Sequence, residues 1–201
     1  MAWDTERTKR LLLDAATEEF TRHGPAGARV DRIAAAAGVN KERIYQYFGN
    51  KDALFRAVLQ AELRASMDDV PMTGTGPEAV GDYAGRLFDH HLENGRIPRL
   101  VFWEGLERGD DPGDEERLRY HARKLDAFQA MLPGVARPAA ADLLLTIVSL
   151  VNAWPVLGQL DRFLCGTAED AGARELSERR AARRRAVVAT VTAAAREAAE
   201  S

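Results

Sequence analysis

The sequence predicts an all-α protein of about nine helices, and three observations support this class. Alanine and arginine are abundant while β-branched residues are sparse, a mixture that favours helix over sheet. Apolar residues recur at helical spacing, as Leu12, Ala16 and Phe20 do at i, i+4 and i+8. No stretch alternates apolar and polar residues in the manner of a half-buried strand, and Gly or Pro separates the apolar segments.

The first two helices are expected at residues 5–23 and 30–37. The first carries the apolar stripe just described and ends at Gly24-Pro25, a dipeptide that breaks helices. The second ends at Gly38, since a glycine can adopt the positive φ that closes a helix.

The next two helices begin after asparagines. Asn40 is a good cap for a short helix at 41–47, and Asn50 can cap a longer one at 51–67. The longer helix carries an apolar face made of Leu54, Phe55, Val58, Leu59 and Leu63. These spacings indicate a compact three-helix head at residues 1–50, with 51–67 as a connector.

The rest of the chain, residues 68–201, is expected to form a second helical domain. Its start is marked by Asp68-Asp69-Val70-Pro71 and by a Gly/Thr-rich stretch. Pro155 is expected to kink the helix that contains it. The predicted helices are 77–94, 97–108, 113–132, 138–165 and 173–199.

Charge and composition narrow the function classes. The net charge is −3, but residues 1–66 hold 11 basic against 9 acidic side chains and the remainder 17 against 22, so the head is mildly basic and the body acidic. Cys165 is the only cysteine, the N-terminus lacks an apolar signal core, and polar residues interrupt the most apolar run, 143–160. We therefore expect a cytoplasmic protein without a membrane span.

Residues 30–51 have the outline of a helix-turn-helix, which lays its second helix in the DNA major groove. Lys41, Arg43 and Gln46 have donors long enough to reach base edges. Tyr45, Tyr47 and Lys51 can contact phosphates. Glu42 repels phosphate, so it should contact a cytosine or pair with a basic neighbour. The alternative is that the two tyrosines are core aromatics of a small bundle.

Four segments of this region resemble the DNA-binding domain of TetR-family transcriptional regulators: LLDAATEEFTRHG (12–24), IAAAAGV (33–39), IYQYF (44–48) and NKDALF (50–55). The resemblance implies that Tyr45, Tyr47 and Lys51 contact the DNA backbone. Three departures from the usual pattern stand out. Arg29 replaces a frequent threonine, Asn40 replaces a frequent serine, and Glu42 and Arg43 replace small residues. The resemblance thus implies how the protein docks on DNA and leaves open which base sequence it reads.

The resemblance also implies a homodimer, an operator of double-stranded DNA and a small-molecule effector. Apolar residues of 138–165 and 173–199 suit a four-helix dimer interface, although burial within one subunit explains them too. Candidates for the ligand pocket are aromatic and polar residues that equally fit a helical core. They are Phe88, His91, Phe102, Trp103, His121, Phe128, Asn152 and Trp154.

The predicted function is a dimeric repressor that a small molecule releases from a palindromic operator. The expected fold is a helix-turn-helix DNA-binding domain followed by a helical ligand-binding and dimerisation domain. The alternative is a ligand-independent DNA-binding regulator with a purely structural body. No motif suggests an enzyme, a cofactor or a metal site; His90 and His91 point to different helix faces. We interpret the basic run 179–185 as a solvated helix face.

Overall fold

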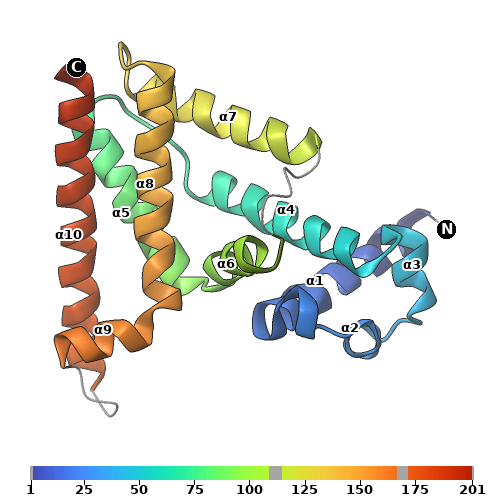
Figure 1. The fold of residues 1–201 in the computed structure, drawn as a ribbon. Helices are drawn as coiled ribbons and strands as arrows, with labels where there is room; N and C mark the ends of the chain where they lie inside the picture. Colours follow the sequence, from blue (N-terminus) through green and yellow to red (C-terminus); the bar gives the residue numbers. More distant parts are fainter. Residues whose placement is uncertain (1, 109–114, 167–171, 201) are drawn as a thin grey trace. The chain divides into compact units, whose positions relative to one another are not determined.

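The computed structural model describes residues 2–108, 115–166 and 172–200, with side chains described for all of these except residues 2–4 and 108. All elements in these ranges are helices, which confirms the all-α class (Figure 1). There are ten: α1 (Ala2–Gly27), α2 (Val30–Ala37), α3 (Glu42–Phe48), α4 (Lys51–Asp69), α5 (Pro77–Glu93), α6 (Arg96–Arg108), α7 (Glu115–Met131), α8 (Arg137–Val156), α9 (Gly158–Cys165) and α10 (Ala173–Glu200).

The tenth helix arises because the predicted helix 138–165 is two helices. Pro155 lies in the last turn of α8, and α8 ends at Val156 with Leu157 in a non-helical conformation. A proline lacks the N–H that continues the helical hydrogen bonds and crowds the preceding turn. The expected kink is therefore a full break, after which α9 takes a new direction (Figure 1).

The chain forms two compact units, and α6 belongs to the first. The first unit comprises residues 1–65 with α6, whereas the predicted boundary placed the helix at 97–108 in the second domain. Long-range packing causes this difference, because α6 contacts α1. The core of the first unit includes the apolar stripes predicted for the first and fourth helices.

The end of α1 shows how closely α6 packs. Gly24 has φ 64° and ψ 172°, which interrupts the helix where a break was predicted. A Cβ at Gly24 would lie 2.8 Å from the Trp103 ring and 2.7 Å from a Glu107 carboxylate oxygen. The Ala26 N–H donates to the same carboxylate at 2.6 Å. Glycine is thus required here both by its backbone angle and by its neighbours.

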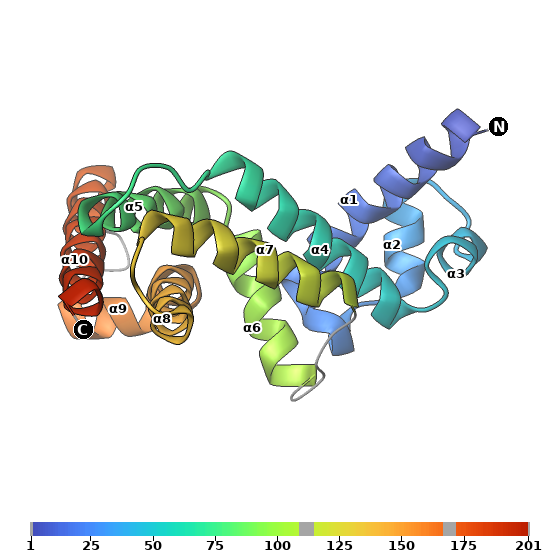
Figure 2. The same ribbon diagram turned by 90° about the horizontal axis from the view of Figure 1, so that it is seen from above.

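The second unit is a bundle in which α5 and α10 pack along each other, with α7 and α8 completing the core. Figure 2 views α8 and α10 nearly along their axes with α5 beside them. Two glycines of α5, Gly81 and Gly85, face α10. A Cβ at Gly81 would lie 2.0 Å from Thr192 Oγ1 and 3.3 Å from the Val188 carbonyl oxygen. The absence of a side chain lets the two helices approach closely.

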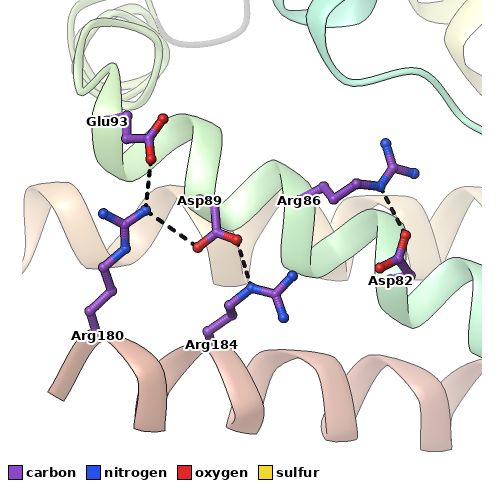
Figure 3. A network of polar contacts seen from close by, with 6 residues as sticks. All are labelled: Asp82, Arg86, Asp89, Glu93, Arg180 and Arg184. Carbon is purple, nitrogen blue, oxygen red and sulfur yellow. Dashed lines mark hydrogen bonds and ion pairs between the residues drawn. The ribbon is translucent and has the colours of Figure 1, made fainter. Parts of the chain in front are cut away.

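A set of ion pairs clamps α10 to α5 (Figure 3). Asp89 accepts hydrogen bonds from Arg184 Nε at 2.6 Å and from Arg180 Nη2 at 3.4 Å, and Glu93 accepts from Arg180 at 3.1 Å. Arg86, one turn before Asp89, pairs instead with Asp82 on its own helix at 2.9 Å.

Two further arginines of the basic run 179–185 lie over Trp154 of α8. The guanidinium carbons of Arg179 and Arg183 are 5.3 and 5.6 Å from the indole centroid, within the range of a cation–π interaction. The interpretation of 179–185 as a merely solvated face is therefore incomplete. Four of its arginines connect α10 to other helices. Arg180 and Arg184 pair with carboxylates of α5, and Arg179 and Arg183 lie over the Trp154 ring of α8.

Among the described helices, α8 is long and apolar enough to cross a membrane, by length and composition only. Only 28% of its most apolar stretch is buried within the chain. The core helix of a water-soluble protein passes the same test, so this finding is weak as a sign of a membrane span. It does show that much of α8 is only partly covered by the rest of the described chain.

Candidate nucleic-acid interface

The turn between α2 and α3 adopts the geometry that the sequence predicts. Gly38 has φ 65° and ψ 31°, the left-handed conformation, and its N–H donates to the Ala35 carbonyl at 3.2 Å. Asn40 Oδ1 accepts a hydrogen bond from the Glu42 N–H at 3.0 Å, and Asn50 Oδ1 accepts one from the Ala53 N–H at 2.8 Å. Both predicted caps are thereby confirmed.

The short helix α3 is anchored by one side chain and exposes most others. Ile44 is fully buried, and Phe48 is partly buried. Tyr45 is 48% exposed, which argues against its being a core aromatic, while Tyr47 is partly buried. The side chains of the remaining predicted contacts on and before this helix are also exposed: Arg29, Asn40, Lys41, Glu42, Arg43 and Gln46.

The predicted base-reading residues have partners within the head. Arg43 Nη1 donates to Gln46 Oε1 at 2.8 Å, and its guanidinium lies 5.9 Å from the Tyr47 ring centroid. Lys41 forms an exposed ion pair with Asp31 of α2 at 3.1 Å. Exposed pairs of this kind contribute little to stability, so exchanging Asp31 for DNA costs little.

Lys51 has a structural role that the sequence did not reveal. Its ammonium donates to the carbonyl oxygen of Ala28, in the connection between α1 and α2, at 3.2 Å and to that of Ala26, at the end of α1, at 3.4 Å. An ammonium has three donors, which leaves one for a phosphate. Lys51 thus holds the start of α4 against the connection that precedes α2.

Glu19 of α1 is a second residue that sequence reasoning missed. Its carboxylate accepts hydrogen bonds from the Arg29 N–H at 2.9 Å and from Arg32 Nε at 2.7 Å. Burial by itself would raise the pKa of Glu19, but these hydrogen bonds and the charge of Arg32 outweigh it and lower the pKa. In the sequence, the one sign of this role is that Glu19 is a polar residue next to the apolar stripe of the first helix.

We expect Glu19→Gln to destabilise the protein by about 1–2 kcal/mol at neutral pH, because two donors lose a charged acceptor. A carboxylate with a lowered folded-state pKa stabilises the fold above its unfolded pKa, and this contribution disappears as the pH falls through the folded pKa. The difference in unfolding free energy between wild type and variant should therefore shrink below about pH 4.5.

The control for this prediction is Glu6→Gln, since Glu6 pairs with Lys9 at the surface. Chemical denaturation at several pH values should show a change within about 0.5 kcal/mol for Glu6→Gln. A pH-independent difference for Glu19→Gln would mean that packing rather than charge explains the role of Glu19.

The predicted pocket residues do not all fall in one unit. Phe102 and Trp103 belong to α6 in the first unit, where Trp103 contacts Gly24. The other six lie in the second unit, and the His121 side chain is exposed there. Phe88 and Phe128 are buried in the core, and Trp154 packs edge-on against Phe88 with centroids 6.2 Å apart.

His91 of α5 and Asn152 of α8 are the buried polar members of this set. They are 4% and 3% exposed. Burial, followed by the charges of Lys124 and His90, lowers the pKa of His91 to about 3, although a side-chain hydrogen bond with Asn152 acts in the opposite direction. By distance and angle, neither His91 Nδ1 nor Asn152 Oδ1 has a further hydrogen-bond partner within the described residues. Among all the residues that the structure describes, no group of three His, Cys, Asp or Glu side chains is arranged to hold a metal ion.

An exposed helix that carries Arg43 and Gln46, presented by a glycine turn and two asparagine caps, defines a DNA-binding protein of the helix-turn-helix class. Residues 12–58 match the family of bacterial regulatory proteins described as tetR, and residues 79–196 match the tetracyclin repressor-like C-terminal domain. The chain belongs to the TetR family. It is a DNA-binding transcriptional regulator and not an enzyme, and regulators of this family bind operator DNA and small-molecule effectors and act as dimers.

Individual relatives agree with this assignment. The chain is 41% identical over 190 residues to the HTH-type transcriptional repressor SCO4008 of Streptomyces coelicolor, covering 91% of this chain and 97% of that protein. The crystal structure of the transcriptional regulator SCO4942 from the same organism matches with a TM-score of 0.68 and 34% identity, over 92% of this chain and 96% of that one. The regulator FadR of Bacillus subtilis, solved with stearoyl-CoA, shares the fold at 18% identity and a TM-score of 0.64, over 92% and 98%.

Proposed function

We propose that the protein is a cytoplasmic, homodimeric repressor that leaves a palindromic operator when a small molecule binds its second unit. The observation that carries this proposal is the exposed face of α3 with Lys41, Arg43 and Gln46. The 41% identical Streptomyces coelicolor protein, named a repressor, supports the sign of regulation.

Arg43 and Gln46 form the centre of the proposed reading surface. Their mutual hydrogen bond and the Tyr47 ring hold the guanidinium in place before DNA arrives, which reduces the entropy lost on binding. Arginine suits the two acceptors of guanine, glutamine suits adenine, and the exposed Glu42 can accept from cytosine. This surface is therefore expected to read bases directly.

Around this centre, other side chains are proposed to contact phosphates and fix the register. They are Arg29, Tyr45, Tyr47 and Lys51, with Lys41 released from Asp31. Asn40 contributes by capping the reading helix. Lys9 of α1, whose ammonium lies 5.9 Å from the Tyr47 centroid, extends the basic surface. Phosphate contacts position the protein but carry little sequence information.

The proposed dimer interface consists of the outer faces of α8 and α10. Pro138, Asp142, Leu145 and Ser149 are exposed at successive spacings of four, three and four residues, and Leu145 is 65% exposed. On α10 the same spacing joins four alanines that are exposed or half-buried: Ala182, Ala186, Ala189 and Ala193. Stripes of this period form helix–helix seams, and small residues let helices approach closely.

The effector is proposed to bind in the second unit and to act through a population shift. The residues that support a site there are His91 and Asn152, with Phe88, Phe128, His121 and Trp154 as further candidates. Phe102 and Trp103, the two other candidates, lie in the first unit. The helix α4 contributes residues to both units. An effector that favours one arrangement of the two ends of α4 therefore changes the fraction of protein that is able to bind DNA.

Selection of bound sequences from a random DNA pool tests the proposed function. We expect two inverted half-sites about 10 base pairs apart, centre to centre, as two recognition helices on one face of the duplex require. Recovery of a single unpaired half-site would contradict the dimeric reading mode.

We expect Arg43→Ala to change operator preference, at a cost of about 1–3 kcal/mol on the preferred sequence and little on sequences altered at its base pair. Tyr47→Phe is the matched comparison, because loss of a phosphate contact should weaken binding to all sequences similarly. Fluorescence anisotropy on the operator and its single-base variants measures both. Uniform weakening by Arg43→Ala would show that Arg43 contacts the backbone.

A further inference from the structure

Arg43 and Gln46 of α3 form one polar unit rather than two independent side chains. They are three residues apart on the helix, so they lie on the same face, and both are exposed. Arg43 Nη1 donates a hydrogen bond to Gln46 Oε1 at 2.8 Å. The Arg43 guanidinium also lies 5.9 Å from the centroid of the half-buried Tyr47 ring, within the range of a cation–π interaction. The position of each polar group therefore depends on the other.

This hydrogen bond determines which end of the Gln46 amide faces Arg43. A guanidinium carries donors and no acceptor, so the amide must turn its oxygen toward Arg43. The amide nitrogen, with its two N–H donors, is then the end of Gln46 that is left to meet a base.

Arg43 keeps the donors that guanine requires. Its hydrogen bond to Gln46 uses one N–H of Nη1, and the edge formed by Nε and Nη2 takes no part in that bond. This edge presents two parallel N–H donors, which match the O6 and N7 acceptors of guanine. Together the two side chains thus offer donors and one positive charge to the major groove.

The positive charge disfavours adenine at the base that Gln46 meets. A bidentate contact with adenine requires the glutamine oxygen to accept from N6 while the glutamine nitrogen donates to N7. The oxygen has a second lone pair, but an amino group that used it would lie beside the guanidinium, whose charge opposes a further donor. A keto oxygen, O6 of guanine or O4 of thymine, is attracted by the same charge and accepts from the amide nitrogen.

We propose that Arg43 and Gln46 read two neighbouring base pairs as a unit, in which Arg43 binds guanine and Gln46 selects a keto base, guanine or thymine. This inference rests on the proposed function, which makes α3 the reading helix. It replaces adenine, the usual partner of glutamine, at one position of the operator. Gln46 is then both a reading residue and the residue that positions Arg43.

Selection of operators by the wild type and by Gln46→Met, followed by anisotropy on single-base variants, tests this inference. The position at which Gln46→Met removes the base preference is the one that Gln46 reads. We expect the wild type to prefer guanine or thymine there by about tenfold over adenine and cytosine. A wild-type preference for adenine or cytosine at this position overturns the proposal, and so does the absence of any position that depends on Gln46.

The same variant tests whether the two residues act as a unit. Arg43→Ala identifies the guanine that Arg43 reads. Gln46→Met should reduce the preference for this guanine by about threefold or more, because Arg43 loses the acceptor that holds it. An unchanged preference at that position would show two independent readers and would contradict the unit.

Gln46→Glu separates the two roles of Gln46. A carboxylate still accepts from Arg43 and neutralises its charge, but it has no donors. This variant should keep the guanine preference of Arg43 and change the preferred base at its own position to cytosine, whose N4 donates. The added negative charge weakens binding to every sequence, so the comparison is made between base variants bound by one protein. A keto preference that survives in Gln46→Glu overturns the proposal.

Tyr45→Phe is the matched control, since Tyr45 is exposed on the same helix and is proposed to contact a phosphate. It should weaken binding to all base variants equally. Gln46 is exposed, so thermal unfolding of both Gln46 variants should resemble that of the wild type.

The selected sequences also separate this inference from the proposed function. Inverted half-sites with adenine at the Gln46 position retain the proposed function and overturn the inference. A single unpaired half-site with a keto base at that position contradicts the dimeric reading mode and retains the inference. Binding without any sequence preference contradicts both.

Discussion

Ala189→Glu should convert the dimer to monomers and reduce operator affinity by about a hundredfold or more. Ala189 lies in the middle of the exposed alanine stripe of α10, where the proposed interface brings a partner helix close. A glutamate there adds volume and a charge to a closely packed seam, and the two copies of a symmetric interface receive both together. A monomer binds only one half-site, so it loses the gain in operator affinity that two linked half-site contacts provide.

Ala181→Glu is the matched control, because Ala181 is exposed on the same helix outside the stripe. Sedimentation analysis should show a dimer for wild type and Ala181→Glu and a monomer for Ala189→Glu. Anisotropy on a full operator and on a half-site should show that only full-operator binding is lost. A dimeric Ala189→Glu would place the interface elsewhere, for example on the exposed apolar residues of α9.

Gly81→Ala should destabilise the second unit by about 1–3 kcal/mol. The new methyl would lie 2.0 Å from Thr192 Oγ1 and 3.3 Å from the Val188 carbonyl, so α5 and α10 must separate or Thr192 must rotate. The closest of these atoms, Thr192 Oγ1, belongs to a side chain that can be removed by mutation. Thr192→Ala in the same protein should therefore recover part of the loss, as a double-mutant cycle measures.

Gly105→Ala is the comparison that isolates packing from helix propensity. Gly105 lies inside α6, and among the described residues no atom outside its own stretch of helix lies within 4 Å of a Cβ placed there. Replacing a helical glycine by alanine in open space stabilises by about 0.5–1 kcal/mol. Chemical denaturation should thus show opposite signs for the same substitution in two helices. Stabilisation by Gly81→Ala would mean that the close approach of α5 and α10 is not tight.

Local signals explain how much of the head could be predicted. The positive φ of Gly38 and the caps at Asn40 and Asn50 depend on residues within four positions of each other. The apolar stripes of α1 and α4 follow from spacing alone, and the exposure of Arg43 follows from the opposite face being apolar. The predicted base contacts Arg43 and Gln46 are exposed for this reason, while their individual roles stay predictions.

Long-range contacts explain what could not be predicted. The grouping of α6 with the first unit depends on Trp103 and Glu107 meeting the Gly24 turn, some eighty residues away in the chain. The roles of Glu19 and Lys51 depend on backbone groups of the α1–α2 connection. In the same way, the run 179–185 was interpreted as a solvated face, but Arg180 and Arg184 pair with Asp89 and so connect α10 to α5.

The sequence by itself determined the helical class, the turn and caps of the reading helix, and the family to which the protein belongs. These depend on residue spacing along one element, where periodicity and capping chemistry act locally. Only the tertiary structure decided where α8 stops, which unit holds α6, and that His91 and Asn152 are buried together. Those outcomes depend on which side chains meet across helices, and no pattern within a single helix specifies its neighbours.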